Sequence, residues 1–564
     1  RGFFLDGGAV SFSNLTITGG RALGGAGTGG GGGAAGMGGA LFVNSGAVTV
    51  NSVTFSANSA TGGAGGAPPV APAAAGPGGN TDFAGLFPFV SAGGPGLTGL
   101  TGNPSLGPGG PGGPGGTAGN GGPGTGGLPG TGLNGGVGGA GGVGGAGTLG
   151  TNGGAGGIGG WLGAGLAAAG CSVSVVARGA AGFGGGGGGG GAGGTGSVAG
   201  ARGNGGVGGF GGGGGSGTLG AISTPLGGLT TGGLGGTNNL GGGGGAGLGG
   251  AIFVNAGSLT LSNSTLFANT ATGGAAGGAG ATAGAGAGAA IFVNNGATAT
   301  LTNNTITANT ATSTVVALAN GGGIATNSGT VTVRNSIVAG NLGGASPDVF
   351  GAFAAASTNN LIGSFAGSTG FAAANLLPAT VPLTSVIVSP AGLNQATAVP
   401  LTYALADSTA TVINPAINGG STALAVGTTQ RGTGFPRTIG TAIDIGAYEY
   451  GPIVTGVKFN DLNGDGVRQA AEPGLPGWVI SVGTKNATTA ADGTYTLRDV
   501  KTATPITEAP PAGTPLTDWI QTVGPTPAST GVIDVTGANF GNFRRTLIAG
   551  KTYTDLLGNK VLDI

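Results

Sequence analysis

Short runs of alternating apolar and polar residues predict strands in two stretches of the chain. Between Ser258 and Ser262, Leu259 and Leu261 alternate with serine and threonine, so one face is apolar and the other polar. The same pattern recurs with nearly the same letters in four segments, which begin at Gly39, Gly250, Ala290 and Gly323 and end at Asn58, Asn269, Asn309 and Asn341. A partial copy occupies 8–17, and no helical period appears.

Such a repeat cannot bury its apolar face alone, so we expect the copies to stack in register as a β-solenoid. Asparagines at equivalent places would then form two ladders, because a buried amide needs hydrogen-bond partners in the neighbouring repeats. Glycines recur at one predicted corner, where a turn favours a residue without Cβ. The first predicted ladder is Asn44, Asn255, Asn294 and Asn327, the second is Asn58, Asn269, Asn309 and Asn341, and the corner glycines are Gly46, Gly257, Gly296 and Gly329.

These repeats resemble the right-handed parallel β-helices of bacterial surface proteins of the polymorphic outer-membrane and autotransporter-adhesin kind. The resemblance covers 4–59 and 249–341, and it implies an all-β fold with β-helix strands at 1–61 and 250–345.

A glycine-rich insertion, 62–249, separates the first two copies. Because nearly identical sequences flank it, we expect the chain to leave and re-enter the solenoid between adjacent turns. Gly-Gly-X triplets fill 109–116 and 135–146. Two interpretations are open: a disordered loop, since ordering so much glycine is entropically unfavourable, or a bundle of extended helices with three residues per turn. The triplets resemble mycobacterial glycine-rich surface proteins and some phage-fibre tips.

Several short motifs occur in a fixed order from Asn335 to Glu449, and most of them lie in the segment 346–450 that follows the repeats. They are Asn335-Ser-Ile-Val-Ala-Gly-Asn341, Pro347-Asp348, Asn359-Asn-Leu-Ile-Gly363, Asn414-Pro-Ala-Ile-Asn418, Gln430-Arg431-Gly, Arg437 and Asp444-Ile-Gly-Ala-Tyr-Glu449. This series resembles the choice-of-anchor Q domain of large secreted bacterial proteins, which implies a cap to the solenoid and a role in surface attachment. Asn414 and Asn418 depart from it, because they stand where the family has Ser and Asp.

The sequence 461–472, Asp-Leu-Asn-Gly-Asp-Gly-Val-Arg-Gln-Ala-Ala-Glu, matches the pattern of a calcium-binding loop at every fixed position. Calcium prefers six to eight hard oxygen ligands. Oxygens would come from the Asp461, Asn463 and Asp465 side chains, the Val467 carbonyl and both oxygens of Glu472. A solvated acidic turn is the alternative. The flanks predict strands rather than helices, because Pro473 and Pro476 follow at once.

Strand and turn signals continue over 453–545 and predict a small Ig-like β-sandwich. The stretch resembles the SdrD B-like, or collagen-adhesin B-type, repeats of bacterial surface stalks. Related stalk domains carry a Lys–Asn isopeptide bond promoted by a Glu, which implies a candidate set of Lys458, Glu508 and either Asn539 or Asn542. A second repeat begins at 546–564, where Leu557 and Lys560 replace an expected Asn and Gly and would impair its calcium site.

Composition narrows the function. The 564 residues include 148 glycines, no histidine, one cysteine, and 16 basic against 16 acidic residues, with no acid between Asp82 and Asp348. No basic cluster indicates nucleic-acid binding, and the apolar stretch 161–176 is short for a membrane span. Without histidine the commonest general base is missing, which argues against an enzyme.

The sequence therefore predicts a secreted or surface-exposed structural or adhesive protein that uses Ca²⁺, a rigid solenoid displayed on calcium-stabilised stalk domains. Surface glycans, neighbouring cells and self-assembly into fibres are the partners this implies. The alternative is a polysaccharide-binding or polysaccharide-cleaving β-helix that uses acids such as Asp348, Asp444 and Glu449. Against it, buried arginine–carboxylate pairs would explain these residues structurally.

Overall fold

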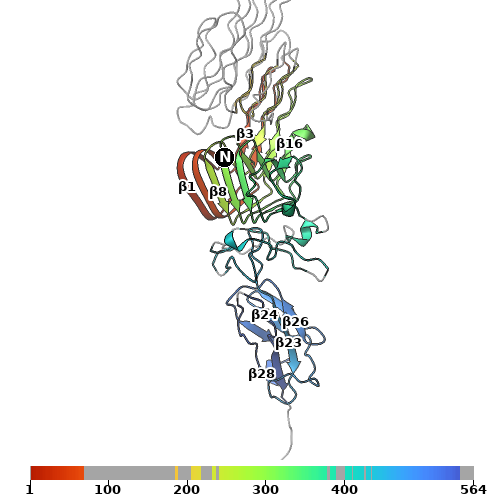
Figure 1. Ribbon diagram of the computed structural model, residues 1–564. Helices are drawn as coiled ribbons and strands as arrows, with labels where there is room; N and C mark the ends of the chain where they lie inside the picture. The colour runs from red at the N-terminus through yellow and green to blue at the C-terminus, as the bar shows by residue number, and fades with distance from the viewer. Residues whose placement is uncertain are drawn as a thin grey trace, which may run out of the picture. The chain divides into compact units, whose positions relative to one another are not determined.

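The computed structural model describes residues 2–68, 184–187, 205–216, 232–236, 240–377, 381–388, 401–408, 411–424, 427–433, 435–531 and 533–545 (Figure 1). The predicted second repeat at 546–564 and the triplets at 109–116 and 135–146 lie outside these residues. The chain divides into two compact units, one of Arg1–Gly432 with Ala442–Glu449, and one of Thr433–Thr441 with Tyr450–Ile564. The described part is all-β, and its helical segments are single 3₁₀ turns.

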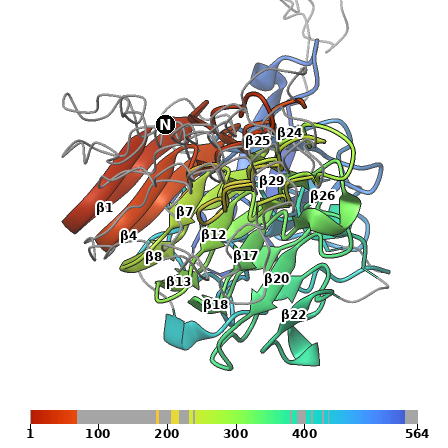
Figure 2. The ribbon, with the colours of Figure 1, turned by 90° about the horizontal axis from the view of Figure 1, so that it is seen from above.

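The first unit is built from three parallel sheets that the chain visits in a repeating order. In each full repeat, here called a pass, the chain adds a strand of two residues to one sheet, strands of three or more residues to a second and a strand of three residues to the third. Figure 2 shows the strands of successive passes side by side, from β1 through β4, β7, β12 and β17 to β20. The early strands are β1 (Phe3–Thr18), β2 (Arg21–Leu23), β3 (Gly36–Met37), β4 (Leu41–Ser56), β5 (Ser59–Thr61), β6 (Gly247–Leu248), β7 (Ile252–Val254), β8 (Ser258–Ser262), β9 (Thr265–Phe267) and β10 (Thr270–Thr272).

Later passes repeat the arrangement and end with shorter strands. The strands are β11 (Gly286–Ala287), β12 (Ile291–Val293), β13 (Thr298–Thr302), β14 (Thr305–Thr307), β15 (Thr310–Thr312), β16 (Ala319–Asn320), β17 (Ile324–Thr326), β18 (Thr330–Arg334), β19 (Ile337–Val338), β20 (Val349–Ala352), β21 (Leu361–Ile362) and β22 (Ser368–Thr369). The 3₁₀ turns are η2 (Val316–Leu318), η3 (Ala373–Asn375), η4 (Leu383–Ser385) and η6 (Thr422–Leu424).

Equivalent positions of the repeats pair with one another. Leu261 of β8 pairs with Val50 of β4 on one side and with Leu301 of β13 on the other. Apolar side chains from successive passes therefore stack on one another in the core. Phe42 and Phe253, for example, stack with ring centroids 4.9 Å apart. This register buries the alternating apolar face that one repeat could not bury alone.

The two predicted asparagine ladders are confirmed. In one, each Nδ2 donates to the Oδ1 of the next pass at 2.8–2.9 Å, from Asn58 through Asn269 and Asn309 to Asn341. The other runs in the opposite direction, from Asn327 through Asn294 and Asn255 to Asn44 at 2.9–3.1 Å. Each ladder ends on a carboxylate: Asn341 donates to Asp348 and Asn44 donates to Asp6.

The insertion leaves and returns between adjacent passes, as expected. Strand β4 pairs directly with β7, β8 and β9, although the insertion separates them in sequence. Glycine segments pack beside the sheets, and consecutive N–H groups reach different neighbours. Gly242, Gly243 and Gly244 donate to Gly66, Gly214 and Thr282, and Gly245 returns to the first neighbouring segment, at Gly63. In the described residues the glycine segments thus bond to their neighbours with a period of three.

The predicted corner is made differently in its last copy. Gly46, Gly257 and Gly296 have φ between +80° and +91°, a conformation that glycine adopts without strain. In the fourth copy the positive φ, +60°, falls on Ser328 instead. Gly329 is required there for space, because a Cβ would lie 2.6 Å from the Asn294 carbonyl oxygen.

Described residues of the segment 401–449 contact the sides of the strands, and the cap to the solenoid that the resemblance implied stays a prediction. Gln430 donates through Nε2 to Thr54 of β4 at 2.9 Å and accepts from Thr265 of β9. The Ala447 N–H donates to Thr305 of β14 at 3.0 Å. Thr54, Thr265 and Thr305 are equivalent positions in successive passes, and the segment buries all three.

The second unit has two small sheets around a common core. One sheet has the order β26-β23-β29-β28 and the other β25-β24-β27. The strands are β23 (Val454–Asn460), β24 (Val479–Val482), β25 (Lys485–Thr488), β26 (Thr494–Leu497), β27 (Ile506–Ala509), β28 (Trp519–Val523) and β29 (Phe540–Arg544), and η7 spans Leu516–Asp518. Core side chains come from both sheets, for example Ile480 and Phe540. No helix in the described residues is long and apolar enough to cross a membrane.

Candidate cross-linking and cation-binding site

A buried lysine lies in the core of the second unit. Lys458, on β23, is fully buried, and its Nζ is 2.8 Å from Oε2 of Glu508, on β27 of the facing sheet. The same Nζ lies 4.3 Å from the ring centroid of Trp478. Burial lowers the pKa of Lys458 to about 8, against the charge and hydrogen bond of Glu508, which raise it. The amine is therefore closer to its neutral, nucleophilic form than an exposed lysine would be.

Asn542 lies on the adjacent strand with both amide atoms unused. Strands β23 and β29 are parallel, and Lys458 pairs with Phe540 while Asn460 pairs with Asn542. Paired residues of a sheet point to the same face and alternate residues share it, so Lys458, Phe540 and Asn542 face the core together. Asn542 is 1% exposed, and neither Nδ2 nor Oδ1 has a hydrogen-bond partner. A buried amide without partners destabilises the fold, so it calls for an explanation.

The register separates the two asparagines that the sequence offered. Asn539 directly precedes Phe540, which shares a face with Lys458. The alternation of side chains along a strand therefore turns Asn539 to the opposite face. Its Oδ1 accepts from the Val457 N–H at 2.9 Å. Asn542, which is buried and unpaired, is therefore the structure's candidate partner for Lys458.

The acidic loop begins one residue after β23. Asp461 is fully buried, and its carboxylate accepts from the N–H groups of Gly464 and Gly466, both at 2.7 Å. Glu472 closes the loop by accepting from the N–H of Leu462 at 2.8 Å and of Gln469 at 3.0 Å. Gly464 and Gly466 have φ of +76° and +77°, which the sharp turn requires.

The electrostatics of the loop favour the ionised form of Asp461. Burial raises the pKa of Asp461, but the Thr522 side chain and three backbone N–H groups of the loop lower it further, and the net pKa falls below the ordinary value. Asp465 is exposed, and its Oδ2 accepts from the Asn463 and Gln469 side-chain amides at 2.9 and 2.7 Å. Val467 is also exposed.

The donor set suits calcium in chemical type: carboxylates, an amide and a carbonyl from one loop. Yet no group of three or more His, Cys, Asp and Glu side chains in the described ranges is arranged to hold a metal ion. The carboxylates of Asp461, Asp465 and Glu472 are thus not gathered around one point. If a cation bound, Asp465 would exchange its amide contacts for it, and calcium binding remains a prediction.

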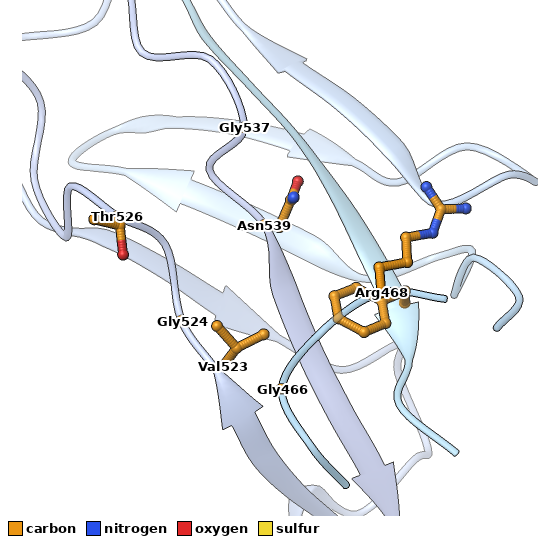
Figure 3. Close-up of a pocket in the computed structure, with 8 residues that line it drawn as sticks. Gly466, Arg468, Val523, Gly524, Thr526, Gly537 and Asn539 are labelled. Carbon is orange, nitrogen blue, oxygen red and sulfur yellow. The ribbon is translucent and has the colours of Figure 1, made fainter. Parts of the chain in front are cut away.

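A small hollow of about 140 Å³ lies between the loop and the last strands (Figure 3). Gly466 and Arg468 line it from the loop, Val523 and Gly524 from the end of β28, and Asn539 from just before β29. Figure 3 shows the loop running beside these strands. The hollow is too small for an extended ligand, since ligand pockets typically measure about 300–1,000 Å³.

The acids considered for a polysaccharide-cleaving site are buried. Asp348, Asp444 and Glu449 are 3%, 2% and 0% exposed. Asp348 ends the asparagine ladder, and Glu449 accepts from the Asp444 N–H at 2.9 Å. Arg431 donates to the Tyr448 hydroxyl at 2.8 Å. The carboxylates of Asp348 and Glu449 thus accept hydrogen bonds from other residues of the fold.

Comparison with known proteins found no matching family model, no matching curated protein and no matching solved structure. The resemblances to choice-of-anchor Q and SdrD B-like domains therefore stay predictions.

Proposed function

We propose that this chain is an extracellular structural or adhesive protein, in which a right-handed parallel β-helix is displayed on a self-cross-linked, Ig-like stalk domain. The observation that carries the proposal is the buried set of Lys458, Glu508 and Asn542, with a nucleophile, a carboxylate and an unsatisfied amide in one water-excluded core.

The set supports formation of an isopeptide bond. Glu508 takes a proton from the Lys458 ammonium, and the neutral Nζ attacks Cγ of Asn542. Glu508 then gives this proton to Nδ2 and takes a second proton from Nζ, the Cγ–Nδ2 bond breaks, and the Nζ–Cγ amide forms. The departing ammonia takes up the second proton from Glu508 and leaves as ammonium. Atoms and charge balance, and no oxidant or cofactor is needed.

The position of the bond suits a load-bearing stalk. Among the described strands of the unit, Lys458 lies on the first and Asn542 on the last. Tension that enters at one end and leaves at the other would pass through the covalent bond, and the residues between 458 and 542 would stay unloaded. Calcium bound at 461–472 would stiffen the same end of the unit.

The first unit supports the display role. Its parallel sheets are visited in a repeating order, as in a β-helix, and side-chain ladders join the passes. Burial of Asp348, Asp444 and Glu449 favours the structural role over polysaccharide cleavage. Surface glycans or neighbouring cells are the partners that we propose, together with self-assembly into fibres.

The test of the cross-link is the intact mass of the purified full chain. We expect the wild type to lack the mass of one ammonia, and the variants Lys458→Ala, Asn542→Ala and Glu508→Gln to retain it. Asn539→Ala is the matched control and should lose ammonia as the wild type does. A wild-type chain of full calculated mass would refute the cross-link.

The display role has its own test. The full chain is incubated with a panel of polysaccharides, and both binding and released chain ends are recorded. Binding without release would support an adhesin. If the chain shows neither binding nor release, the result supports a purely structural fibre. Release of chain ends would overturn the non-enzymatic proposal.

A further inference from the structure

A second asparagine lies in register with the asparagine that the proposed cross-link would consume. We propose that Asn460 donates a hydrogen bond from its side-chain amide to Oδ1 of Asn542 while Lys458 attacks, and so stabilises the negative charge that forms on this oxygen. This inference rests on the proposed function, because it assigns a further catalytic residue to the same reaction.

Strand register places Asn460 next to Asn542. Strands β23 and β29 are parallel, and the two asparagines pair with each other near the ends of both strands. The Asp461 N–H donates to the Asn542 backbone carbonyl at 3.0 Å, so the pairing is held beyond this point. Neighbouring strands lie about 4.8 Å apart, and paired residues point to the same face. Because Asn460 also lies two residues after Lys458, all three side chains are on the core face of the sheet.

Amides at paired positions are within hydrogen-bonding reach of each other. In the first unit, asparagines at equivalent positions of neighbouring parallel passes bond through Nδ2 and Oδ1 at 2.8–3.1 Å. Asn460 and Asn542 do not make this bond, since Oδ1 of Asn460 and both amide atoms of Asn542 are buried without a partner. Rotation of the Asn460 amide about its Cβ–Cγ bond therefore brings Nδ2 toward Asn542 without breaking a hydrogen bond at Asn460 Oδ1.

The reaction requires a hydrogen-bond donor at Oδ1 of Asn542. When Nζ of Lys458 attacks Cγ, the electron pair of the carbonyl moves to Oδ1, and the negative charge stays there until the Cγ–Nδ2 bond breaks. Asn542 is 1% exposed, so solvent does not supply this donor. Glu508 moves protons between Nζ and Nδ2, which leaves Oδ1 to another group. A donor that bonds only to the charged oxygen lowers the barrier without stabilising the starting state.

A side chain that only fills space at position 460 predicts a different result. Asn460→Asp keeps the shape of the side chain and Asn460→Leu keeps most of its volume, but neither offers an N–H donor. Removal of one donor to a developing oxyanion typically slows a reaction about a hundredfold or more, so both variants should cross-link slowly. If the side chain only filled space, both variants would cross-link at the wild-type rate.

The experiment follows ammonia loss by intact mass in the full chain, made in a short cell-free pulse and transferred to buffers of different pH. We expect the wild-type rate to rise with pH as Lys458 loses its proton, and then to reach a plateau. Asn460→Leu should lower the plateau about a hundredfold and leave the midpoint in place, because Lys458 and Glu508 are unchanged. Asn486→Asp, at an exposed position of β25, is the matched control and should behave as the wild type.

Folding is checked separately from the reaction. Rates are compared only between chains that circular dichroism shows to be folded, and Asn460→Asp supplies the rate if Asn460→Leu does not fold. Each substitution is also made in the Lys458→Ala background, which cannot form the bond. We expect equal melting temperatures there for Asn460→Asp and its parent, which assigns the slow cross-linking to the reaction.

The outcomes separate the two proposals. If folded Asn460→Leu and Asn460→Asp lose ammonia as fast as the wild type, the role of Asn460 is wrong and the cross-link stands. A shifted pH midpoint with an unchanged plateau in Asn460→Leu would also overturn this role, since the side chain would then act on the amine. If folded wild type never loses ammonia under any condition, the cross-link itself is wrong and this inference falls with it.

Discussion

Asn341 donates through Nδ2 to Oδ1 of Asp348 at 2.9 Å, and this contact ends a buried row of four asparagines on a single carboxylate. The Asn341 N–H reaches the same oxygen at 3.0 Å. Every amide in the row donates toward this end, so the row requires an acceptor there. Aspartate supplies one without offering a competing donor.

The end of this ladder should make stability depend on pH. Burial raises the pKa of Asp348 to about 6 from 3.8, although the hydrogen bonds from Asn341 and from the Ser364 backbone lower it. Between these two values the unfolded chain has released the proton and the folded chain retains it. Folding stability should therefore fall as pH rises from about 4 to about 6, by at most about 3 kcal/mol.

Replacing Asp348 with Asn should remove this dependence, because the amide does not titrate. The measurement is the unfolding free energy of the first unit across that pH range. Asp6→Asn, at the exposed end of the other ladder, is the control and should leave the dependence in place. An unchanged slope in Asp348→Asn would contradict the assignment.

Breaking the ladder in its middle should be strongly destabilising. Asn309 is fully buried and bonds to Asn269 on one side and Asn341 on the other. Asn309→Ala removes the acceptor of the buried Asn269 N–H and the side-chain donor to the Leu266 and Thr307 carbonyls. Each buried group left unpaired costs about 1–3 kcal/mol. We expect the unfolding transition of the first unit to shift down by at least about 2 kcal/mol. Asn295→Ala, at an exposed turn of the same pass, is the control and should shift it by less than about 0.5 kcal/mol.

The packed glycine segments should not tolerate a methyl group. A Cβ at Gly243 would lie 2.0 Å from the Gly233 carbonyl oxygen, and that backbone is itself hydrogen-bonded. Gly243→Ala should lower the calorimetric transition temperature of the first unit or prevent its folding. Gly531→Ala, where the nearest atom is 3.9 Å away, is the control. Equal tolerance at both positions would show that these segments do not pack as described.

Calcium should stabilise the second unit. A ligand that binds only the folded form adds about 2.7 kcal/mol at a hundred times its dissociation constant. In calorimetry of the full chain, the transition of this unit should rise with calcium and return with chelator. Glu472→Gln should lose most of the response, because the closing carboxylate becomes a weaker neutral ligand. Identical melts with calcium and with chelator would disprove the site.

The repeats allowed the side-chain ladders of the first unit to be predicted from the sequence. Asn44, Asn255 and Asn294 occupy equivalent places in nearly identical text, so stacking in register was enough to predict their ladder. The return of the chain beside β4 was predictable for the same reason. The carboxylate at each end was not predicted, because Asp348 follows the last copy and Asp6 precedes the partial copy 8–17.

The candidate site in the second unit shows where sequence reasoning ended. The resemblance to stalk domains offered Asn539 and Asn542 as alternatives, since both stand near the family position. A shift of one residue in strand register moves a side chain to the opposite face, and only the pairing of Asn460 with Asn542 decided between them. The hydrogen bond from Asp461 to the Asn542 backbone follows from the same pairing.

The sequence by itself determined the all-β class, the repeats with their internal ladders, and the loop with calcium-type ligands, because these depend on local alternation and on spacing within short segments. The tertiary structure alone decided that the segment after 400 lies along Thr54, Thr265 and Thr305, that the glycine segments bond to three neighbours in turn, and that Lys458, Glu508 and Asn542 share one core. Those contacts join residues far apart in the chain, and their geometry depends on strand register and packing, which no local pattern encodes.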